Sequence, residues 1–292
     1  MASGKGGTGK TTLTAAFAHL AAAHNRVVVA DADVEASNLP LALRVRTDDC
    51  LAFSGGAEAS IDESTCSACG ACHDVCRFAA ILPGTDHYLV DHLSCEGCGR
   101  CEHECPVGAI TMRVRTVGEA CTGSSSIGPA AFGQLGPGQD LSGRLVTEVR
   151  RLASEAAGRH DADLLLIDGP PGVGCPLIAA VASTDLLVAV AEPSVSGAHD
   201  LERLVKLARR LNLPVLVVLN KADLAEEGAK RIRALSRDHS LPIIAEVPFD
   251  PTIAGMLEAL ASGRDAMAVR TPALVAITEA WDRVRDELNG GI

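Results

Sequence analysis

The stretch Gly4-Lys5-Gly6-Gly7-Thr8-Gly9-Lys10-Thr11 matches the phosphate-binding pattern G-x-x-x-x-G-K-[ST]. Glycines let backbone N–H groups turn towards phosphate oxygens, Lys10 neutralises the β- and γ-phosphates, and the Thr11 hydroxyl can bind Mg²⁺. A helix that follows such a loop adds the positive end of its dipole. The stretch therefore predicts a site for a nucleoside triphosphate with Mg²⁺. The predicted binding residues are Gly4, Gly6, Gly7, Thr8, Gly9, Lys10, Thr11 and Thr12.

The segments around this loop predict an α/β fold. A helix is expected over Thr12–Ala23, and an apolar strand over Val27–Ala30 ends in Asp31-Ala-Asp33. Continuous apolar runs of four to six residues are typical of strands buried on both faces. We therefore expect a mostly parallel sheet covered by helices on both faces, with a last helix near Pro272–Leu288. The other predicted strands are Leu164–Ile167, Leu186–Val190, Val215–Leu219 and Ile243–Val247.

A phosphate-binding loop normally follows a strand, yet only Met1 and Ala2 come before Ser3. We expect residues upstream of this chain to supply that strand. The alternative is a sheet that lacks a central member.

The eleven cysteines are unevenly distributed, because eight of them fall between Cys66 and Cys105. The pattern C-x2-C-x2-C-x3-C occurs twice, with an offset of 29 residues. Three closely spaced thiolates followed by a fourth are typical of iron–sulfur ligands. Zinc is the alternative, although a tetrahedral zinc site needs no third close cysteine. The first repeat holds Cys66, Cys69, Cys72 and Cys76, and the second holds Cys95, Cys98, Cys101 and Cys105.

The cysteine repeat interrupts the α/β pattern and predicts three segments. Residues 1–60 form the first part of the nucleotide-binding domain, residues 61–112 an inserted α+β domain, and residues 113–292 the second part. Thr116–Gly143 holds seven glycines and two prolines, so it is expected to be a loop-rich return into the main fold.

The net charge is −11, from 26 Lys and Arg against 37 Asp and Glu. This charge repels nucleic acid and anionic lipid, and five Phe, one Trp and one Tyr are too few for base stacking. No apolar run reaches the roughly 18 residues of a membrane span, and the sequence opens on the glycine loop instead of a signal peptide. We expect a cytoplasmic protein that binds neither nucleic acid nor membrane and has no disulfides.

The second lysine of the loop, Lys5, makes it resemble the deviant Walker A motif of the MinD and ParA superfamily of P-loop ATPases. The resemblance implies a P-loop NTPase fold and a dimer, either a homodimer or a heterodimer with a related ATPase, in which Lys5 reaches the partner's nucleotide. It implies that Asp33 positions the attacking water. It also implies that Asp168, in Leu-Leu-Ile-Asp168-Gly-Pro-Pro, completes the Mg²⁺ shell with Thr11. The expected catalytic residues are Lys5, Lys10, Asp33 and Asp168.

The base pocket is predicted from Asn220-Lys221-Ala222-Asp223 and a later loop, Val247-Pro248-Phe249-Asp250. The resemblance implies that Asn220, Asp223 and Pro248 surround adenine. The N-K-x-D form is also the one that GTPases use for guanine, so GTP is the alternative.

The cysteine repeat resembles two-cluster bacterial ferredoxins, in which the fourth cysteine of each repeat binds the other cluster. Arg77 departs from the pattern, because the second repeat has the expected proline, Pro106, at this place. Eight acids against two bases over residues 61–112 favour low reduction potentials, and hence electron transfer with an unknown redox partner protein. The implied ligands are Cys66, Cys69, Cys72 and Cys105 for one 4Fe–4S cluster, and Cys95, Cys98, Cys101 and Cys76 for the other.

Three cysteines lie outside the repeat. Cys175 follows Asp168 by seven residues, at a place similar to that of a ligand of the dimer-bridging cluster in the nitrogenase iron protein. Together with Cys121 it raises the alternative of a third cluster. Small buried thiols are the simpler expectation, and Cys50 is placed in that class.

Together these features resemble MinD-superfamily ATPases that contain an inserted two-cluster ferredoxin domain. The implied function is ATP binding and hydrolysis coupled to electron transfer through two 4Fe–4S clusters. One alternative is an iron–sulfur cluster assembly or carrier ATPase, like the Mrp-type relatives. Another is a GTPase or a positioning protein similar to MinD or ParA.

Overall fold

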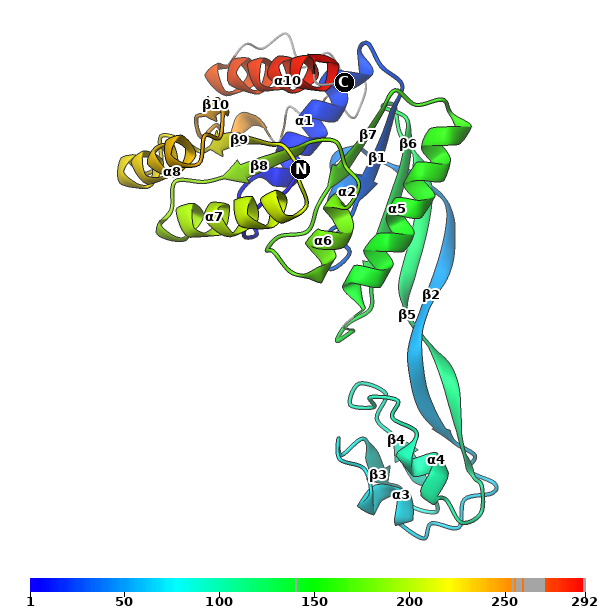
Figure 1. Ribbon diagram of the computed structural model, residues 1–292. Helices are drawn as coiled ribbons and strands as arrows, with labels where there is room; N and C mark the ends of the chain where they lie inside the picture. Colours follow the sequence, from blue (N-terminus) through cyan, green and yellow to red (C-terminus); the bar gives the residue numbers. More distant parts are fainter. Residues whose placement is uncertain (140, 254, 256–258, 260–270, 291–292) are drawn as a thin grey trace. The chain divides into compact units, whose positions relative to one another are not determined.

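The computed structural model describes residues 1–139, 141–253, 255, 259 and 271–290. The chain divides into two compact units. The first comprises Met1–Leu51, Glu119–Leu135 and Ser142–Ile292, and the second comprises Ala52–Gly118 and Gly136–Leu141. Figure 1 shows the helices and strands of both units.

Parallel strands form the centre of the first unit. A five-stranded sheet has the order β2-β5-β6-β1-β7, and a three-stranded sheet has the order β10-β9-β8. β1 pairs in parallel with β6 and β7, and β9 pairs in parallel with β8 and β10. The strands of these two sheets are β1 Val27–Asp31, β2 Arg46–Ile61, β5 Ile110–Ser124, β6 Pro129–Leu135, β7 Leu164–Asp168, β8 Leu187–Ala191, β9 Val215–Asn220 and β10 Ile243–Val247, and parts of β2 and β5 belong to the second unit.

Residues 1–3 connect the two sheets. The Ala2 N–H donates to the carbonyl of Val188 in β8 at 2.9 Å. On the other side, the Gly169 N–H donates to the Met1 carbonyl at 3.0 Å, directly after β7. A cavity of about 210 Å³ beside this link is lined by residues of β7 and β8. A short central segment between β7 and β8 therefore leads directly into the glycine loop.

Helices cover both faces of the sheets. α5 contacts β1, β6 and β7, while α1 and α10 share a hydrophobic core with β1, β8 and β9. α7 and α8 share a second core with the other face of β8 and β9. No described helix is long and apolar enough to cross a bilayer. The helices of this unit are α1 Lys10–Ala22, α2 Leu39–Ala42, α5 Ser142–Arg159, α6 Cys175–Val181, α7 Val195–Arg210, α8 Glu226–Asp238 and α10 Pro272–Gly290.

Alternating side chains of β8 separate the two cores. Val188 and Val190 belong to the core with α1 and α10, whereas Leu187 and Ala189 belong to the core with α7 and α8. Burial on both faces explains why these strands read as continuous apolar runs. The predicted strands and first helix are confirmed to within about two residues, and so is the parallel α/β class.

The expectation of a loop-rich return over Thr116–Gly143 is wrong, because this stretch contains the end of β5 and all of β6. Its glycines permit close packing. A Cβ at Gly133 would come within 2.8 Å of the Val149 side chain on α5, and one at Gly123 within 2.5 Å of the Arg46 carbonyl.

The two cysteine repeats of the second unit have equivalent local structure. The short helices α3 (Ala71–Asp74) and α4 (Arg100–Glu104) each follow a glycine in the left-handed region, Gly70 and Gly99. The remaining strands, β3 Ile81–Pro83 and β4 Tyr88–Val90, pair antiparallel.

Each repeat is completed by the end of the other one. The Asp62 N–H, before the first repeat, donates to the Ala109 carbonyl after the second repeat at 2.8 Å. The Asp91 N–H, before the second repeat, donates to the Ala80 carbonyl after the first repeat at the same distance. Two backbone hydrogen bonds therefore join the segments that flank one repeat to those that flank the other.

Ala79 and Gly108 occupy equivalent left-handed positions, with φ of 51° and 65°. Alanine in this region costs about 1–2 kcal/mol in backbone strain, whereas glycine loses about 0.5–1 kcal/mol more conformational entropy on folding. We expect Ala79→Gly to stabilise the second unit by about 0.5 kcal/mol and Gly108→Ala to destabilise it by a similar amount. Denaturant unfolding followed by the emission of Tyr88, the single tyrosine, measures both changes. If both substitutions changed the free energy of unfolding in the same direction, the left-handed conformation assigned to both positions would be contradicted.

Candidate nucleotide site and cysteine sites

A buried ion pair lies at the centre of the nucleotide site. Asp168 ends β7 and is fully buried, and Lys10, the first residue of α1, is 6% exposed. Lys10 Nζ lies 2.8 Å from Asp168 Oδ1, and the Thr11 hydroxyl donates to Asp168 Oδ2 at 2.6 Å. The Thr14 hydroxyl donates to the same carboxylate at 2.9 Å. The structure therefore brings together Lys10, Thr11 and Asp168, which were predicted to bind phosphate and Mg²⁺, and it adds Thr14.

A second carboxylate, Asp31, was not among the predicted site residues. Asp31 ends β1 in register with Asp168 on the neighbouring parallel strand, and it is 1% exposed. Its carboxylate accepts hydrogen bonds from the Asp33 N–H, the Ser37 hydroxyl and the Leu39 N–H, so it holds the loop that carries Asp33. Asp33 itself is half-buried, and burial raises its pKa against the opposing charge of Lys10. The signal that could have identified Asp31 was its place at the end of a fully apolar strand.

Asp31 makes stability depend on pH. Burial, and then the charge of Asp168, raise the pKa of Asp31 to about 6. The folded chain therefore holds this proton up to a higher pH than the unfolded chain, whose aspartates titrate near pH ~3.9. The free energy of unfolding should fall as pH rises from about 4 to about 6, by up to about 3 kcal/mol from this group. Asp31→Asn should flatten that slope when unfolding is followed by Trp281 emission with chelator and without nucleotide; an unchanged slope would contradict the assignment.

The loop has the features of a phosphate cradle. Gly9 has φ of 87°, and a Cβ there would come within 2.3 Å of the Asn220 amide nitrogen. That amide donates to the Thr8 carbonyl at 2.7 Å and fixes the loop. The Thr8 hydroxyl is buried and has no hydrogen-bond partner among the described residues. A buried hydroxyl of this kind, two residues before Lys10, fits an anionic ligand that would accept its hydrogen bond.

The predicted base pocket contains a cavity of about 190 Å³. Asn220 and Pro248, which were predicted for the base pocket, line it together with Thr12 and Phe249. Asp223 is not part of the lining, because its carboxylate accepts the Phe249 N–H at 2.6 Å and so holds the loop after β10.

Lys5 is held within its own chain. Its Nζ lies 2.6 Å from Glu192 Oε1 and donates to the Ser194 hydroxyl at 3.0 Å. The other oxygen of Glu192 lies 3.3 Å from Lys221 Nζ, which also donates to the Gly7 carbonyl. Burial raises the pKa of Glu192, but the hydrogen bonds from the two lysines outweigh it and leave the pKa below its usual range. Glu192 was not among the predicted site residues, because it belongs to no sequence motif.

The eight repeat cysteines form two groups in the second unit, each at a small cavity. One cavity is lined by Cys66, Cys69, Cys72 and Cys105, and the other by Cys76, Cys95, Cys98 and Cys101. Each group therefore contains three cysteines of one repeat and the last cysteine of the other.

Backbone N–H groups donate to the sulfurs of Cys76 and Cys105, the last cysteine of each repeat. The Ala80 N–H donates to Cys76 Sγ and the Ala109 N–H to Cys105 Sγ, both at 3.3 Å. Hydrogen bonds of this kind stabilise negative charge on cluster ligands. Backbone and side-chain hydrogen bonds lower the pKa of the Cys69 thiol, whereas burial raises the pKa of Cys101. Two quartets of free thiols that receive N–H donors fit 4Fe–4S ligation.

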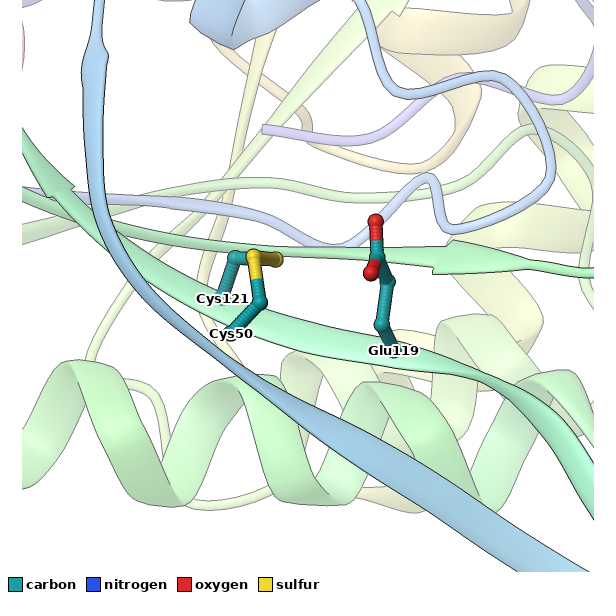
Figure 2. A group of neighbouring side chains, drawn as sticks. All are labelled: Cys50, Glu119 and Cys121. Atoms are coloured by element: carbon teal, nitrogen blue, oxygen red, sulfur yellow. A yellow bond between two sulfur atoms is a disulfide. The ribbon is translucent and has the colours of Figure 1, made fainter.

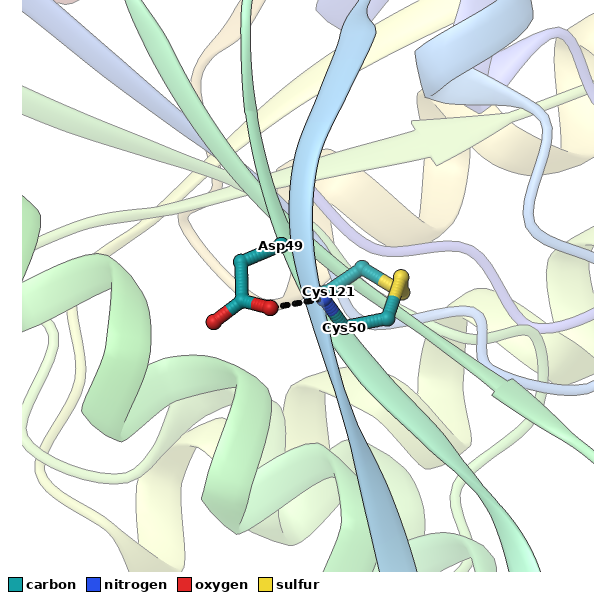
Figure 3. The surroundings of a disulfide bond; sticks show 3 residues. All are labelled: Asp49, Cys50 and Cys121. Atoms are coloured by element: carbon teal, nitrogen blue, oxygen red, sulfur yellow. Dashed lines mark hydrogen bonds between the residues drawn. A yellow bond between two sulfur atoms is a disulfide. The ribbon is translucent and has the colours of Figure 1, made fainter.

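The expectation that the chain has no disulfides is wrong, because Cys50 and Cys121 are bonded (Figure 3). Cys50 is exposed, which contradicts the expectation of a small buried thiol. Cys121 is buried, but the disulfide removes it as a ligand of a third cluster in this state. The reason is the long strands β2 and β5, which were not predicted and which place the two residues opposite each other. Cys175 is a free cysteine at the start of α6, but it is exposed, so the expectation of a buried thiol is wrong for it too.

Comparison with known proteins places this geometry in a family. Residues 1–260 match the CobQ/CobB/MinD/ParA nucleotide binding domain. The chain belongs to this family. Its members include the MinD and ParA proteins that the glycine loop resembles, so the predicted superfamily is confirmed, and with it the P-loop NTPase fold.

Two of the similar proteins align over most of this chain, and a third aligns over about a third of it. The protein MJ0578 of Methanocaldococcus jannaschii is 34% identical over 247 residues, which are 84% of each chain. The structure of the septum site-determining protein MinD with Mg-ADP from Pyrococcus horikoshii aligns with a TM-score of 0.55 at 20% identity, covering 99% of this chain and 95% of that one. An iron–sulfur cluster carrier protein of Rickettsia bellii is 33% identical over 95 residues, 32% of this chain and 29% of its own. The comparisons thus establish a nucleotide-binding MinD/ParA-like ATPase.

Proposed function

We propose that this family member hydrolyses ATP and couples its nucleotide state to electron transfer through two 4Fe–4S clusters. The observation that carries the proposal is the coexistence, in one chain, of the Lys10–Thr11–Asp168 site and two quartets of cysteines. A 4Fe–4S cluster held by such a quartet supplies one-electron transfer. The proposed ligands are Cys66, Cys69, Cys72 and Cys105 for one cluster and Cys76, Cys95, Cys98 and Cys101 for the other.

The nucleotide site supports specific roles. Lys10 and the loop N–H groups would bind phosphate oxygens, and Thr11 and Asp168 would hold Mg²⁺ once Lys10 turns to the phosphates. Asp33 would orient the attacking water from a loop that Asp31 fixes.

ATP is favoured over GTP by the state of Asp223. A carboxylate that binds guanine must lie against the ring, but Asp223 is not among the residues that line the cavity, and its Oδ1 accepts the Phe249 N–H in the loop after β10. Thr12, Asn220 and Phe249 instead offer a cavity that suits adenine stacked against an aromatic ring.

The proposed dimer gives Lys5 a second role. To reach a partner's nucleotide, Lys5 must leave Glu192, and this contact is partly exposed on both sides. Such a pair is worth about 1 kcal/mol and each homodimer breaks two of them, so Glu192→Gln should raise the ATP-dependent dimer association constant about thirtyfold. Analytical ultracentrifugation with ATP and Mg²⁺ measures it. Glu202→Gln, which breaks the surface pair with Lys206 on α7, is the matched control and should have no effect; equal dimer fractions in both variants would argue against the role of Lys5.

Anaerobic reconstitution tests the proposed coupling. We expect about eight irons per chain and a phosphate-release rate that differs severalfold between oxidised and dithionite-reduced protein. Protein without iron would overturn the cluster assignment. If iron-loaded protein released phosphate at the same rate in its oxidised and reduced forms, the proposed coupling would be overturned.

Cluster delivery is the second candidate, favoured by the partial similarity to the iron–sulfur cluster carrier protein and by the exposure of Cys69 and Cys98. The two functions differ in how firmly iron is held. A carrier loses iron to a chelator or an apo-acceptor when ATP is added, whereas an electron-transfer protein retains it.

A further inference from the structure

Cys50 and Cys121 carry a chemistry that neither the nucleotide site nor the cysteine quartets use. We propose that this pair is a thiol–disulfide exchange site, opened by an external dithiol that attacks Cys50 and closed again by the reverse exchange with the disulfide form of that dithiol. Its place, its surroundings and the difference in burial between the two cysteines carry the inference.

The pair lies where the chain passes from one unit to the other. Cys50 belongs to β2 and is followed by Leu51, the last residue of its segment of the first unit. Cys121 belongs to β5, two residues after Glu119, which begins the next segment of the first unit. The two Cα atoms are 4.1 Å apart, and the two residues lie on neighbouring strands of the sheet. The bond therefore joins both strands at the unit boundary.

Few other side chains hold this part of β2. β2 is an edge strand, and all side chains over 46–52 are exposed. The Arg46–Asp48 pair lies within the strand, and the Ser124 hydroxyl reaches Asp48 only at 3.5 Å. An exposed edge without packed side chains opens locally at low free energy. The disulfide is consequently the strongest side-chain link between β2 and β5 at this position.

The two sulfurs are not equally accessible. Cys50 is exposed, whereas Cys121 is 2% exposed. An incoming thiolate therefore reaches Cys50, and Cys121 is the leaving group.

Glu119 controls the rate of that step. Figure 2 shows the Glu119 side chain on the same side of β5 as the disulfide, and its carboxylate and the two sulfurs lie within 4.8 Å of one another. Negative charge there repels both the attacking and the departing thiolate, while it leaves the neutral disulfide unaffected. Glu119 thus keeps the exchange slow.

The exchange balances with a dithiol as reductant. One sulfur of the dithiol bonds to Cys50 Sγ while the Cys50–Cys121 bond breaks, and Cys121 leaves as a thiolate that takes up a proton. The second sulfur of the dithiol then bonds to the first and displaces Cys50. Two electrons and two protons pass to the chain, which gains two thiols, and the dithiol becomes a disulfide.

The test uses the full, anaerobically prepared chain. It is incubated with reduced or oxidised dithiothreitol, alkylated, and mapped for the linked Cys50–Cys121 peptide. We expect the linked peptide to disappear under native reduction and to return on oxidation. Hydrogen exchange of 46–51 should be severalfold faster in the reduced form. The Cys50→Ser/Cys121→Ser variant should show no difference between the two conditions.

A second comparison isolates Glu119. Glu119→Gln should accelerate reduction severalfold, whereas Glu287→Gln on α10, an exposed acid elsewhere, should leave the rate unchanged. The proposal is overturned if the wild-type bond never forms, or if it survives reduction of the folded chain. It is equally overturned if the reduced chain holds stoichiometric zinc that protects both thiols, which would make Cys50, Glu119 and Cys121 a metal site.

Discussion

Lys10→Ala should lower the rate of ATP hydrolysis at least about 100-fold, because a positioned cation on the transferred phosphoryl group is lost. The expected loss has a structural component as well. Lys10 and Asp168 are buried together, and removal of one partner leaves a buried charge, at a cost of about 3 kcal/mol in the free energy of unfolding. Phosphate release and denaturant unfolding measure the two effects separately.

A double variant distinguishes these effects. Lys10→Ala with Asp168→Asn removes both charges, so stability should recover while the rate of hydrolysis stays at least about 100-fold below that of the wild type. Lys206→Ala, at an exposed pair on α7, should change neither. Hydrolysis that persists in well-folded Lys10→Ala protein would refute the assigned phosphate site.

The exchange of cysteines between repeats predicts a second large effect. Cys76 and Cys98 line the same cavity although they belong to different repeats. The variant Cys76→Ser/Cys98→Ser should therefore damage one cluster and retain about four irons per chain. If each repeat instead bound its own cluster, the same variant would damage both clusters and lose nearly all iron.

The matched variant reverses the outcome. Cys105 lines the other cavity, so Cys105→Ser/Cys98→Ser should damage both clusters. Iron analysis and the electron paramagnetic resonance of the reduced protein compare the two variants, which have the same number of substitutions. Equal iron retention in both would refute the exchanged assignment.

Local patterns predicted much of the fold and site. The glycine loop, the apolar strands and the strand-end Asp168 were readable because each depends on neighbours in the sequence or on burial on both faces. The grouping of the cysteines across the two repeats came from the resemblance to two-cluster ferredoxins, because the spacing alone does not say which repeat the fourth cysteine completes.

Other features depended on contacts between distant segments without a pattern. The first half of β2 is an exposed edge with no apolar alternation, so nothing in the sequence predicted a strand that brings Cys50 to Cys121. Glu192 meets Lys5 only through the loop after β8. The glycines of Thr116–Gly143 were predicted to form turns, because the sequence alone does not distinguish a glycine that lets a helix pack closely against a strand from one that bends the chain.

The division of the first unit into separated segments affects the order of folding during synthesis. β1 finds both of its neighbours, β6 and β7, only after the whole second unit has been translated, and Lys10 and Asp168 are 158 positions apart. The second unit forms mainly through contacts that are close in the sequence. The first unit must close long loops, which is slow, and its apolar strands stay unpaired until then. On the ribosome the cysteine-rich unit should become protease-resistant first, and the ATP site should assemble last, when α6 and the strands beyond it emerge.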